Sequence, residues 1–198
     1  MATVALVDCG ASNLGSVRYA LERLGVNPLI TTDAGTIAAA SHVILPGVGA
    51  AAPAMRRLRE LGLFDALRGL RQPLLGICLG MQLLHEYLAE GDVAGLGLLP
   101  GTVEALQPNG GLRVPHIGWN ALDIVRENGL LAGIPECNAY VYFVHGYAVP
   151  SGDDVLALTE HGERFTALER RGAVCGMQFH PERSGAIGAR LLENFLAL

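Results

Sequence analysis

The chain has 198 residues, of which 51% are hydrophobic, and a formal net charge of −5 at pH 7. This length and composition predict one domain over residues 1–198, or one domain with a small insertion, and a substantial buried core. The charges are spread without long runs of one sign, which argues against broad binding to nucleic acid or to an anionic membrane. We therefore expect a small molecule or another protein as the partner.

The N-terminal stretch and the cysteines indicate the compartment. Residues 1–8 lack a basic region followed by a cleavable apolar segment, and no later apolar run approaches the ~20 residues that span a bilayer. We expect a cytoplasmic protein. The four cysteines are too sparse for a disulfide scaffold and lack the Cys-x-x-Cys spacing of zinc sites, so we expect reduced thiols and no metal (Cys9, Cys78, Cys137 and Cys175).

The first half of the chain alternates short apolar strands with helices. Residues 3–7 form a predicted buried strand, and a turn follows that leads into a helix with Asn13 as its predicted N-cap. Further strands are predicted at residues 27–31 and 42–45, with a helix or turn at residues 34–40 between them. This alternation favours an α/β fold with an open, mostly parallel sheet covered by helices on both faces.

A glycine-rich segment at residues 46–52 follows the strand at residues 42–45. It formally matches the dinucleotide-binding fingerprint, but the acidic residue that binds ribose should end a strand about 20 residues further on. The nearest candidate, Asp65, lies in a predicted helix at residues 63–70. We therefore interpret the segment as a loop that offers backbone N–H groups to a substrate.

An apolar run at residues 73–84 turns sharply at Cys78. Its first part suits a buried strand, and helical spacing continues from Cys78 as far as Glu86, so this cysteine falls at a strand-to-helix junction. Gly76 and Gly80 make room where the two backbones nearly touch, as in the nucleophile elbow of hydrolases. A thiol at a helix N-terminus ionises more readily. The alternative is a small buried cysteine flanked by chance glycines, in a chain that has 26 of them.

The C-terminal half has shorter and more polar strands after a segment rich in glycine and proline at residues 91–111. We expect antiparallel strands there, with one hairpin of residues 138–144 and 155–159 and another of residues 166–170 and 174–179. An amphipathic helix is predicted to close the chain over residues 185–198.

His180 and Glu182 follow the last predicted strand directly. A histidine at the C-terminal end of a strand, with a carboxylate two residues later, can act as a general base whose tautomer Glu182 fixes. Cys78 also lies at a strand end, on the edge where open α/β sheets place their ligands. The three residues therefore permit a Cys-His-Glu triad. The alternative is a surface histidine beside a solvated glutamate.

Taken in order and spacing, these motifs resemble the triad-type, class I glutamine amidotransferases, and the resemblance spans nearly the whole chain. Finer motifs resemble the glutaminase subunits of imidazole glycerol phosphate synthases, with the segment Pro-His-Ile-Gly-Trp-Asn the most specific (residues 7–14, 46–49, 114–120, 142–147 and 179–184). Two positions depart from that pattern. Cys9 replaces the usual tyrosine, and Gly146 stands where a small hydroxyl residue is common.

The resemblance implies a flavodoxin-like class I glutaminase fold and a glutaminase without a cofactor. Cys78 would attack the side-chain amide of glutamine, His180 would manage the protons, and Glu182 would orient the histidine. A thioester would form, ammonia would leave, and the oxyanion would be held by the N–H groups of Leu79 and Val48. By similarity, the remaining substrate contacts would come from the glycine loop, a helix and one strand end (Gly47, Gly49, Gln82, Glu90, His145, Gly146 and Tyr147).

The resemblance also implies a partner, since nothing in the chain looks able to bind a phosphoribosyl acceptor. In the family this partner is a (β/α)8-barrel cyclase subunit in a heterodimer that serves histidine biosynthesis. We expect Trp119 and Asn120, in a glycine-flanked loop, to dock on it, because exposed aromatic residues often anchor interfaces. The alternative is a tryptophan buried in the core.

Three other functions stay open from the sequence. The chain could be the glutaminase of another synthase, such as that for pyridoxal phosphate or anthranilate, although the context of Trp119 disfavours this. It could be a free-standing γ-glutamyl hydrolase, which would be active alone. It could also be a non-catalytic flavodoxin-like binding module, which an unreactive Cys78 would support.

Overall fold

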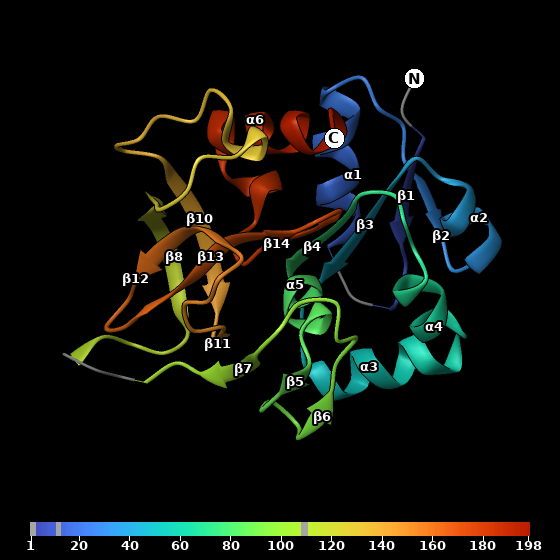
Figure 1. Ribbon diagram of the computed structural model, residues 1–198, viewed down its shortest axis with the longest axis horizontal. Helices are drawn as coiled ribbons and strands as arrows, with labels where there is room; N and C mark the ends of the chain where they lie inside the picture. Colours follow the sequence, from blue (N-terminus) through green and yellow to red (C-terminus); the bar gives the residue numbers. More distant parts are fainter. Residues whose placement is uncertain (1–2, 11–12, 108–110) are drawn as a thin grey trace.

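The computed structural model describes residues 3–10, 13–107 and 111–198 (Figure 1). Its centre is an eight-stranded sheet with the order β2-β1-β3-β4-β14-β13-β12-β9. Neighbouring strands run parallel from β2 to β14 and antiparallel from there to β9. The predicted α/β fold, with a mostly parallel sheet and antiparallel strands in the C-terminal half, is confirmed. The parallel strands are β1 (Val4–Val7), β2 (Leu29–Thr31), β3 (His42–Gly47), β4 (Leu74–Cys78) and β14 (Val174–Met177).

Helices cover both faces of this sheet, because strand side chains alternate between two hydrophobic cores. Leu6 and Ile77 pack into one core, and Val7 and Leu45 pack into the other. The first core is closed by α1 (Leu14–Arg23) and α6 (Gly185–Leu196). The second is closed by α2 (Ala34–Ala39), α3 (Ala51–Glu60), α4 (Leu63–Arg68) and α5 (Leu79–Leu84). Asp65 lies within α4, as the interpretation of the glycine-rich segment requires.

One predicted hairpin is confirmed and the other is wrong. β13 (Arg164–Arg171) pairs antiparallel with β14 across a tight turn. By contrast, β12 (Val155–Glu160) pairs with β13 and with the short β9 (Asp123–Ile124), while β10 (Tyr140–His145) pairs with β8 (His116–Ala121) in a separate two-stranded sheet. The burial patterns explain the difference, since β12 is buried on both sides along most of its length whereas β10 buries only every second residue.

A third sheet, of four strands, connects the elbow helix to the rest of the C-terminal half. Its order is β11-β7-β5-β6, and it joins β5 (Tyr87–Leu88), β6 (Val93–Ala94), β7 (Thr102–Ala105) and β11 (Tyr147–Ala148). Gly146 separates β10 from β11, so the chain leaves one small sheet and enters another at this residue. The described part of the chain also contains the 3₁₀ turns η2 (Gly129–Leu131) and η3 (Pro181–Arg183).

The elbow between β4 and α5 is packed so closely that only glycine fits around it. A Cβ atom on Gly80 would lie 1.8 Å from the carbonyl oxygen of Leu45, and one on Gly76 would lie 2.6 Å from Met81 Cα. A Cβ atom on Gly47, at the end of β3, would lie 2.8 Å from the backbone nitrogen of Gly80. Atoms do not approach so closely in folded proteins, so these glycines are required by contact between backbones.

The elbow helix is shorter than the sequence pattern suggests. α5 ends at Leu84 and His85 is extended, so the prediction that helical spacing continues to Glu86 is wrong. The carbonyl of Leu84 accepts backbone hydrogen bonds from Leu98 and Leu99, and these bonds replace the next turn of the helix. Within the described ranges, no helix is both long enough and apolar enough to cross a membrane.

Candidate active site

Cys78 occupies a strained backbone conformation at the end of β4. Its φ and ψ angles are 53° and −114°, in a region that residues other than glycine rarely adopt. The tight packing of β4 against α5 holds this conformation, and the side chain is almost completely buried. Its Sγ lies 3.7 Å from the carbonyl oxygen of Val144 and 3.9 Å from Gln178 Nε2. The expected elbow geometry at this cysteine is therefore present.

His180 and Glu182 form a buried pair beside Cys78. The Nδ1 atom of His180 lies 2.8 Å from Glu182 Oε1, which places a proton on Nδ1. Burial acts to lower the pKa of His180, but hydrogen bonding with Cys78 and Glu182, together with their negative charges, raises it to about 10. Nε2 makes no protein hydrogen bond of normal geometry in the described part of the chain, so this nitrogen is free to exchange a proton.

Asn13 is a residue of this site that the sequence analysis assigned to another role. It is the N-cap residue of α1, as predicted, but it adopts a left-handed conformation and its side chain makes no capping hydrogen bond. Instead Asn13 Nδ2 donates to Glu182 Oε1 over 2.6 Å. The available signal was its place in a segment that carried the family resemblance, but 169 residues separate the two partners.

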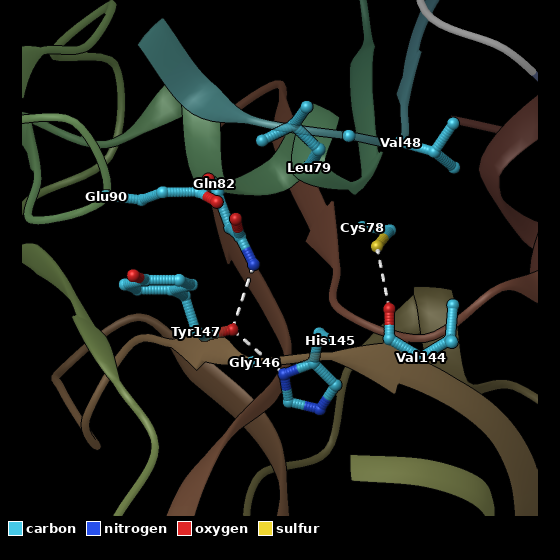
Figure 2. Close-up of a pocket in the computed structure, with 10 residues that line it drawn as sticks. Val48, Cys78, Leu79, Gln82, Glu90, Val144, His145, Gly146 and Tyr147 are labelled. Atoms are coloured by element: carbon cyan, nitrogen blue, oxygen red, sulfur yellow. Dashed lines mark hydrogen bonds between the residues drawn. The ribbon is translucent and has the colours of Figure 1, made fainter. Parts of the chain in front are cut away.

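A cavity of about 350 Å³ opens beside the thiol (Figure 2). It collects residues that follow β3, residues of the elbow, one residue after β5 and residues around the junction between β10 and β11 (Val48, Gly49, Cys78, Leu79, Gln82, Glu90, Val144, His145, Gly146 and Tyr147). Most residues predicted to bind substrate are thus brought together around one space. Gly47 is not in its lining and packs beneath the elbow, whereas Val144 lines it without having been predicted.

Two polar side chains of the cavity are held in place by the protein. Glu90 Oε2 accepts a hydrogen bond of 2.9 Å from the backbone N–H of Ala51, at the start of α3. Gln82 Nε2 donates to the carbonyl of Tyr147 over 2.9 Å and to Gln178 Oε1 over 3.0 Å. Both hydrogens of the Gln82 amide are therefore used, and its oxygen is the atom that can contact a ligand.

The imidazole of His145 is engaged within the protein on both sides. Its Nδ1 lies 2.8 Å from the carbonyl oxygen of Tyr147, and its Nε2 lies 3.1 Å from His116 Nδ1. Burial lowers the pKa of His145 to about 3, although the hydrogen bond to Tyr147 acts in the opposite direction. Neither ring nitrogen is left for a ligand, so this segment contributes to the cavity mainly through its backbone.

Trp119 and Asn120 lie away from the cavity, on β8. The prediction that they occupy a loop is wrong, because both belong to regular strand paired with β10. Trp119 is 56% exposed, so the alternative of a core tryptophan is also wrong. Ile117 and Tyr140 on the same two-stranded sheet are exposed as well. Asn120, the next residue along the strand, instead donates from Nδ2 to the carbonyl of Glu160.

The other cysteines have different surroundings from Cys78. Cys9 and Cys175 are buried, whereas Cys137 is exposed. Burial raises the pKa of Cys175 to about 12, which keeps that thiol protonated and unreactive. No group of side chains able to hold a metal ion occurs among the residues that the structure describes.

Comparison with known proteins decides the family. Residues 5–198 match the model of the class-I glutamine amidotransferase family. The chain belongs to this family. It is 59% identical to "Imidazole glycerol phosphate synthase subunit HisH" of Xanthomonas euvesicatoria pv. vesicatoria over 100% of its own length and 98% of that protein. The protein of the same description from Xylella fastidiosa (strain Temecula1) is 56% identical over the same shares.

Solved structures show the same fold at low sequence identity. A glutamine amidotransferase superimposes with a TM-score of 0.76 at 24% identity, covering 98% of this chain and 97% of that one. PurLQS from Thermotoga maritima superimposes with a TM-score of 0.73 at 23% identity, covering 100% and 99%. These structures share the fold of this chain. The family match and the relatives show that the chain is a glutamine amidotransferase enzyme.

The buried histidine predicts how stability depends on pH. An ordinary histidine has a pKa near 6.5, so between that value and about 3 the unfolded chain binds a proton at His145 that the folded chain does not. Acidification must therefore destabilise the fold. From pH 7 to pH 5 this group alone should remove about 2 kcal/mol from the free energy of unfolding.

Between pH 7 and pH 5, the free energy of unfolding of the variant His145→Gln should fall by about 2 kcal/mol less than that of the wild type. Urea unfolding of both proteins at pH 7 and pH 5 measures the difference, and the overall stability of the variant does not enter it. Equal pH dependence in the two proteins would contradict the prediction, as would titration of the wild-type ring near pH 6.5 by NMR.

Proposed function

We propose that the chain is the glutaminase subunit of an imidazole glycerol phosphate synthase, which hydrolyses glutamine to glutamate and passes the ammonia to a synthase partner. The observation that carries the proposal is the strained Cys78 thiol at the mouth of the cavity, beside the buried His180–Glu182 pair. The relatives at 56–59% identity, which bear that subunit's name, support the choice of synthase.

In the first half of the proposed reaction, the thiolate of Cys78 attacks the side-chain amide carbon of glutamine. The carbonyl becomes an oxyanion, which the backbone N–H groups of Leu79 and Val48 would hold. As the C–N bond breaks, the imidazolium of His180 donates its Nε2 proton to the nitrogen, and ammonia leaves. The raised pKa of His180 supports this step, since it keeps the proton available at neutral pH.

In the second half, His180 is neutral and acts as the base. It removes a proton from water, the resulting hydroxide attacks the thioester, and the C–S bond breaks to release glutamate and the Cys78 thiolate. Glu182 would hold the ring with its proton on Nδ1 and compensate the positive charge. Asn13 would in turn fix the carboxylate of Glu182, because its amide N–H donates to the same oxygen that faces the histidine.

The amino-acid end of glutamine would be bound further along the cavity. Glu90 keeps one carboxylate oxygen beyond its bond to α3, and this negative charge suits the substrate's α-ammonium group. Gln82 would offer its amide oxygen, and the backbone at Gly146 and Tyr147 would supply the remaining polar contacts.

The partner in this proposal is a (β/α)8-barrel cyclase subunit, and the two chains would form a heterodimer in the cytoplasm. We place the docking face on β8 and β10, where Trp119, Ile117 and Tyr140 are exposed together. Large aromatic groups of this kind dominate the affinity of many protein interfaces. No cofactor takes part in the proposed chemistry.

Replacing the nucleophile tests the reaction. In the complex with the cyclase subunit, Cys78→Ala should abolish glutamine-dependent synthesis and leave ammonia-dependent synthesis unchanged, because ammonia bypasses the glutaminase. Cys137→Ala, which alters an exposed thiol, is the matched control and should retain both activities. Glutamine-dependent turnover by Cys78→Ala would refute the assignment. Full activity of the isolated wild-type chain would favour a free-standing hydrolase.

Truncating the exposed tryptophan tests the docking face. Trp119→Ala should weaken association with the cyclase subunit by ~2 kcal/mol or more, measured by titration calorimetry, because interface tryptophans carry much of the binding energy. Its melting temperature should barely change, since the ring is largely exposed. Leu29→Ala, which removes an exposed side chain from the opposite edge of the main sheet, should bind normally. Unchanged association of Trp119→Ala would exclude this face.

A further inference from the structure

Gln178 is a fully buried polar residue to which neither the sequence analysis nor the proposed reaction gives a role. It directly follows β14 and precedes His180 by two residues. Its exposed fraction is 0%, and its backbone N–H donates to the carbonyl of Ala167. Its side-chain amide lies between the nucleophile and the cavity wall, with Nε2 3.9 Å from Cys78 Sγ and Oε1 3.0 Å from Gln82 Nε2.

The direction of these hydrogen bonds is fixed by one backbone carbonyl. The oxygen of Tyr147 can only accept, so Gln82 must turn its NH₂ group toward it (Figure 2). The same nitrogen then donates its second hydrogen to Gln178, which must present its oxygen to Gln82. The NH₂ group of Gln178 is thereby turned toward Cys78. Rotation of the Gln82 amide would bring its oxygen against the Tyr147 oxygen, and rotation of the Gln178 amide would bring two NH₂ groups together.

Two histidines, linked by a hydrogen bond, also hold the carbonyl of Tyr147 in place. His145 Nδ1 must carry a proton in order to donate to the Tyr147 oxygen, so its Nε2 accepts from His116 Nδ1. Burial lowers the pKa of His145 to about 3 and that of His116 to about 4, so each ring carries one proton near neutral pH. This chain of hydrogen bonds begins at Asn120, on the strand that bears Trp119. Asn120 Nδ2 lies 3.5 Å from His116 Nε2.

We propose that Gln178 is a positioning residue that stabilises the thiolate of Cys78 by a hydrogen bond whose direction the Tyr147 carbonyl sets. When the thiol is neutral, its S–H can donate to the carbonyl oxygen of Val144 at 3.7 Å. Once the sulfur is ionised it can only accept, and that carbonyl oxygen then repels it. The N–H of Gln178 can only donate, so it favours the ionised form selectively.

The inference rests on the proposed function only in taking Cys78 as the nucleophile. The ionisable groups that face the sulfur, His180 with Glu182 behind it, are unchanged by Gln178→Met, which adds no charge. A change in the reactivity of the thiol can therefore be assigned to the lost N–H donor. Such a donor to a charged acceptor is worth about 10-fold in an equilibrium.

The test uses two variants of the full-length chain. Gln178→Met lacks the N–H donor and the acceptor for Gln82 and adds no charge. Gln178→Glu keeps an acceptor for Gln82 but lacks the N–H and adds a carboxylate beside the sulfur. Iodoacetamide alkylation of Cys78, followed by peptide mass spectrometry over a range of pH, should reach half its maximal rate about 1 pH unit higher in Gln178→Met, and higher still in Gln178→Glu, where the negative charge adds to the lost donor. In the complex with the cyclase subunit, kcat should fall about 10-fold in Gln178→Met with little change in KM.

Thr166→Val is the matched control, because it removes a hydrogen bond made by another fully buried side chain, from Thr166 Oγ1 to the carbonyl of Pro150. It should lower stability and leave the pH dependence of alkylation as in the wild type. A wild-type pH dependence in Gln178→Met would make Gln178 merely structural and overturn the proposal.

A measurement on the wild type covers the case in which the variants do not fold. The side-chain amide resonance of Gln178 should shift with pH at the same midpoint as Cys78 alkylation, and absence of a shift would overturn the proposal. If alkylation of Cys78 left glutamine-dependent synthesis intact, the proposed function would fail instead, whatever the behaviour of Gln178.

Discussion

The structure depends on the close approach of three backbones, those of β3, β4 and the first turn of α5. At Gly47, Gly76 and Gly80 there is room for a hydrogen atom and for nothing larger. This contact forces the chain to reverse direction at Cys78, which lies between two of these glycines and accepts a positive φ angle. Two hydrophobic cores, one on each face of the sheet, hold the sheet and the helix in place and so maintain this strained conformation.

The elbow becomes a site because of where parallel strands end. β3, β4 and β14 are neighbours that run in the same direction, so the residues after them meet at one edge of the sheet. That edge brings together Val48, Cys78 and His180 from distant parts of the sequence. The junction between β10 and β11 then closes over it and supplies the carbonyl of Tyr147 that orients the buried amides.

The sequence was sufficient for the parts of the fold that local patterns encode. Apolar strands, the glycines of the elbow and the hairpin of β13 and β14 were all predicted from short stretches. The partner of β10 was predicted wrongly, because strand pairing depends on burial that emerges only when the sheets pack. Asn13 was predicted as the N-cap of α1, and its side-chain bond to Glu182 was missed because Glu182 lies at the far end of the chain. The exposure of Trp119 likewise depends on which face of β8 is covered.

The most direct test of this account is to identify the atom that glutamine acylates. The complex with the cyclase subunit, given glutamine and quenched in acid during turnover, should yield a γ-glutamyl thioester on the peptide that contains Cys78 and on no other. An electrophilic glutamine analogue should label the same peptide. A thioester on Cys9, Cys137 or Cys175, or turnover at full rate after Cys78 has been labelled, would contradict the account.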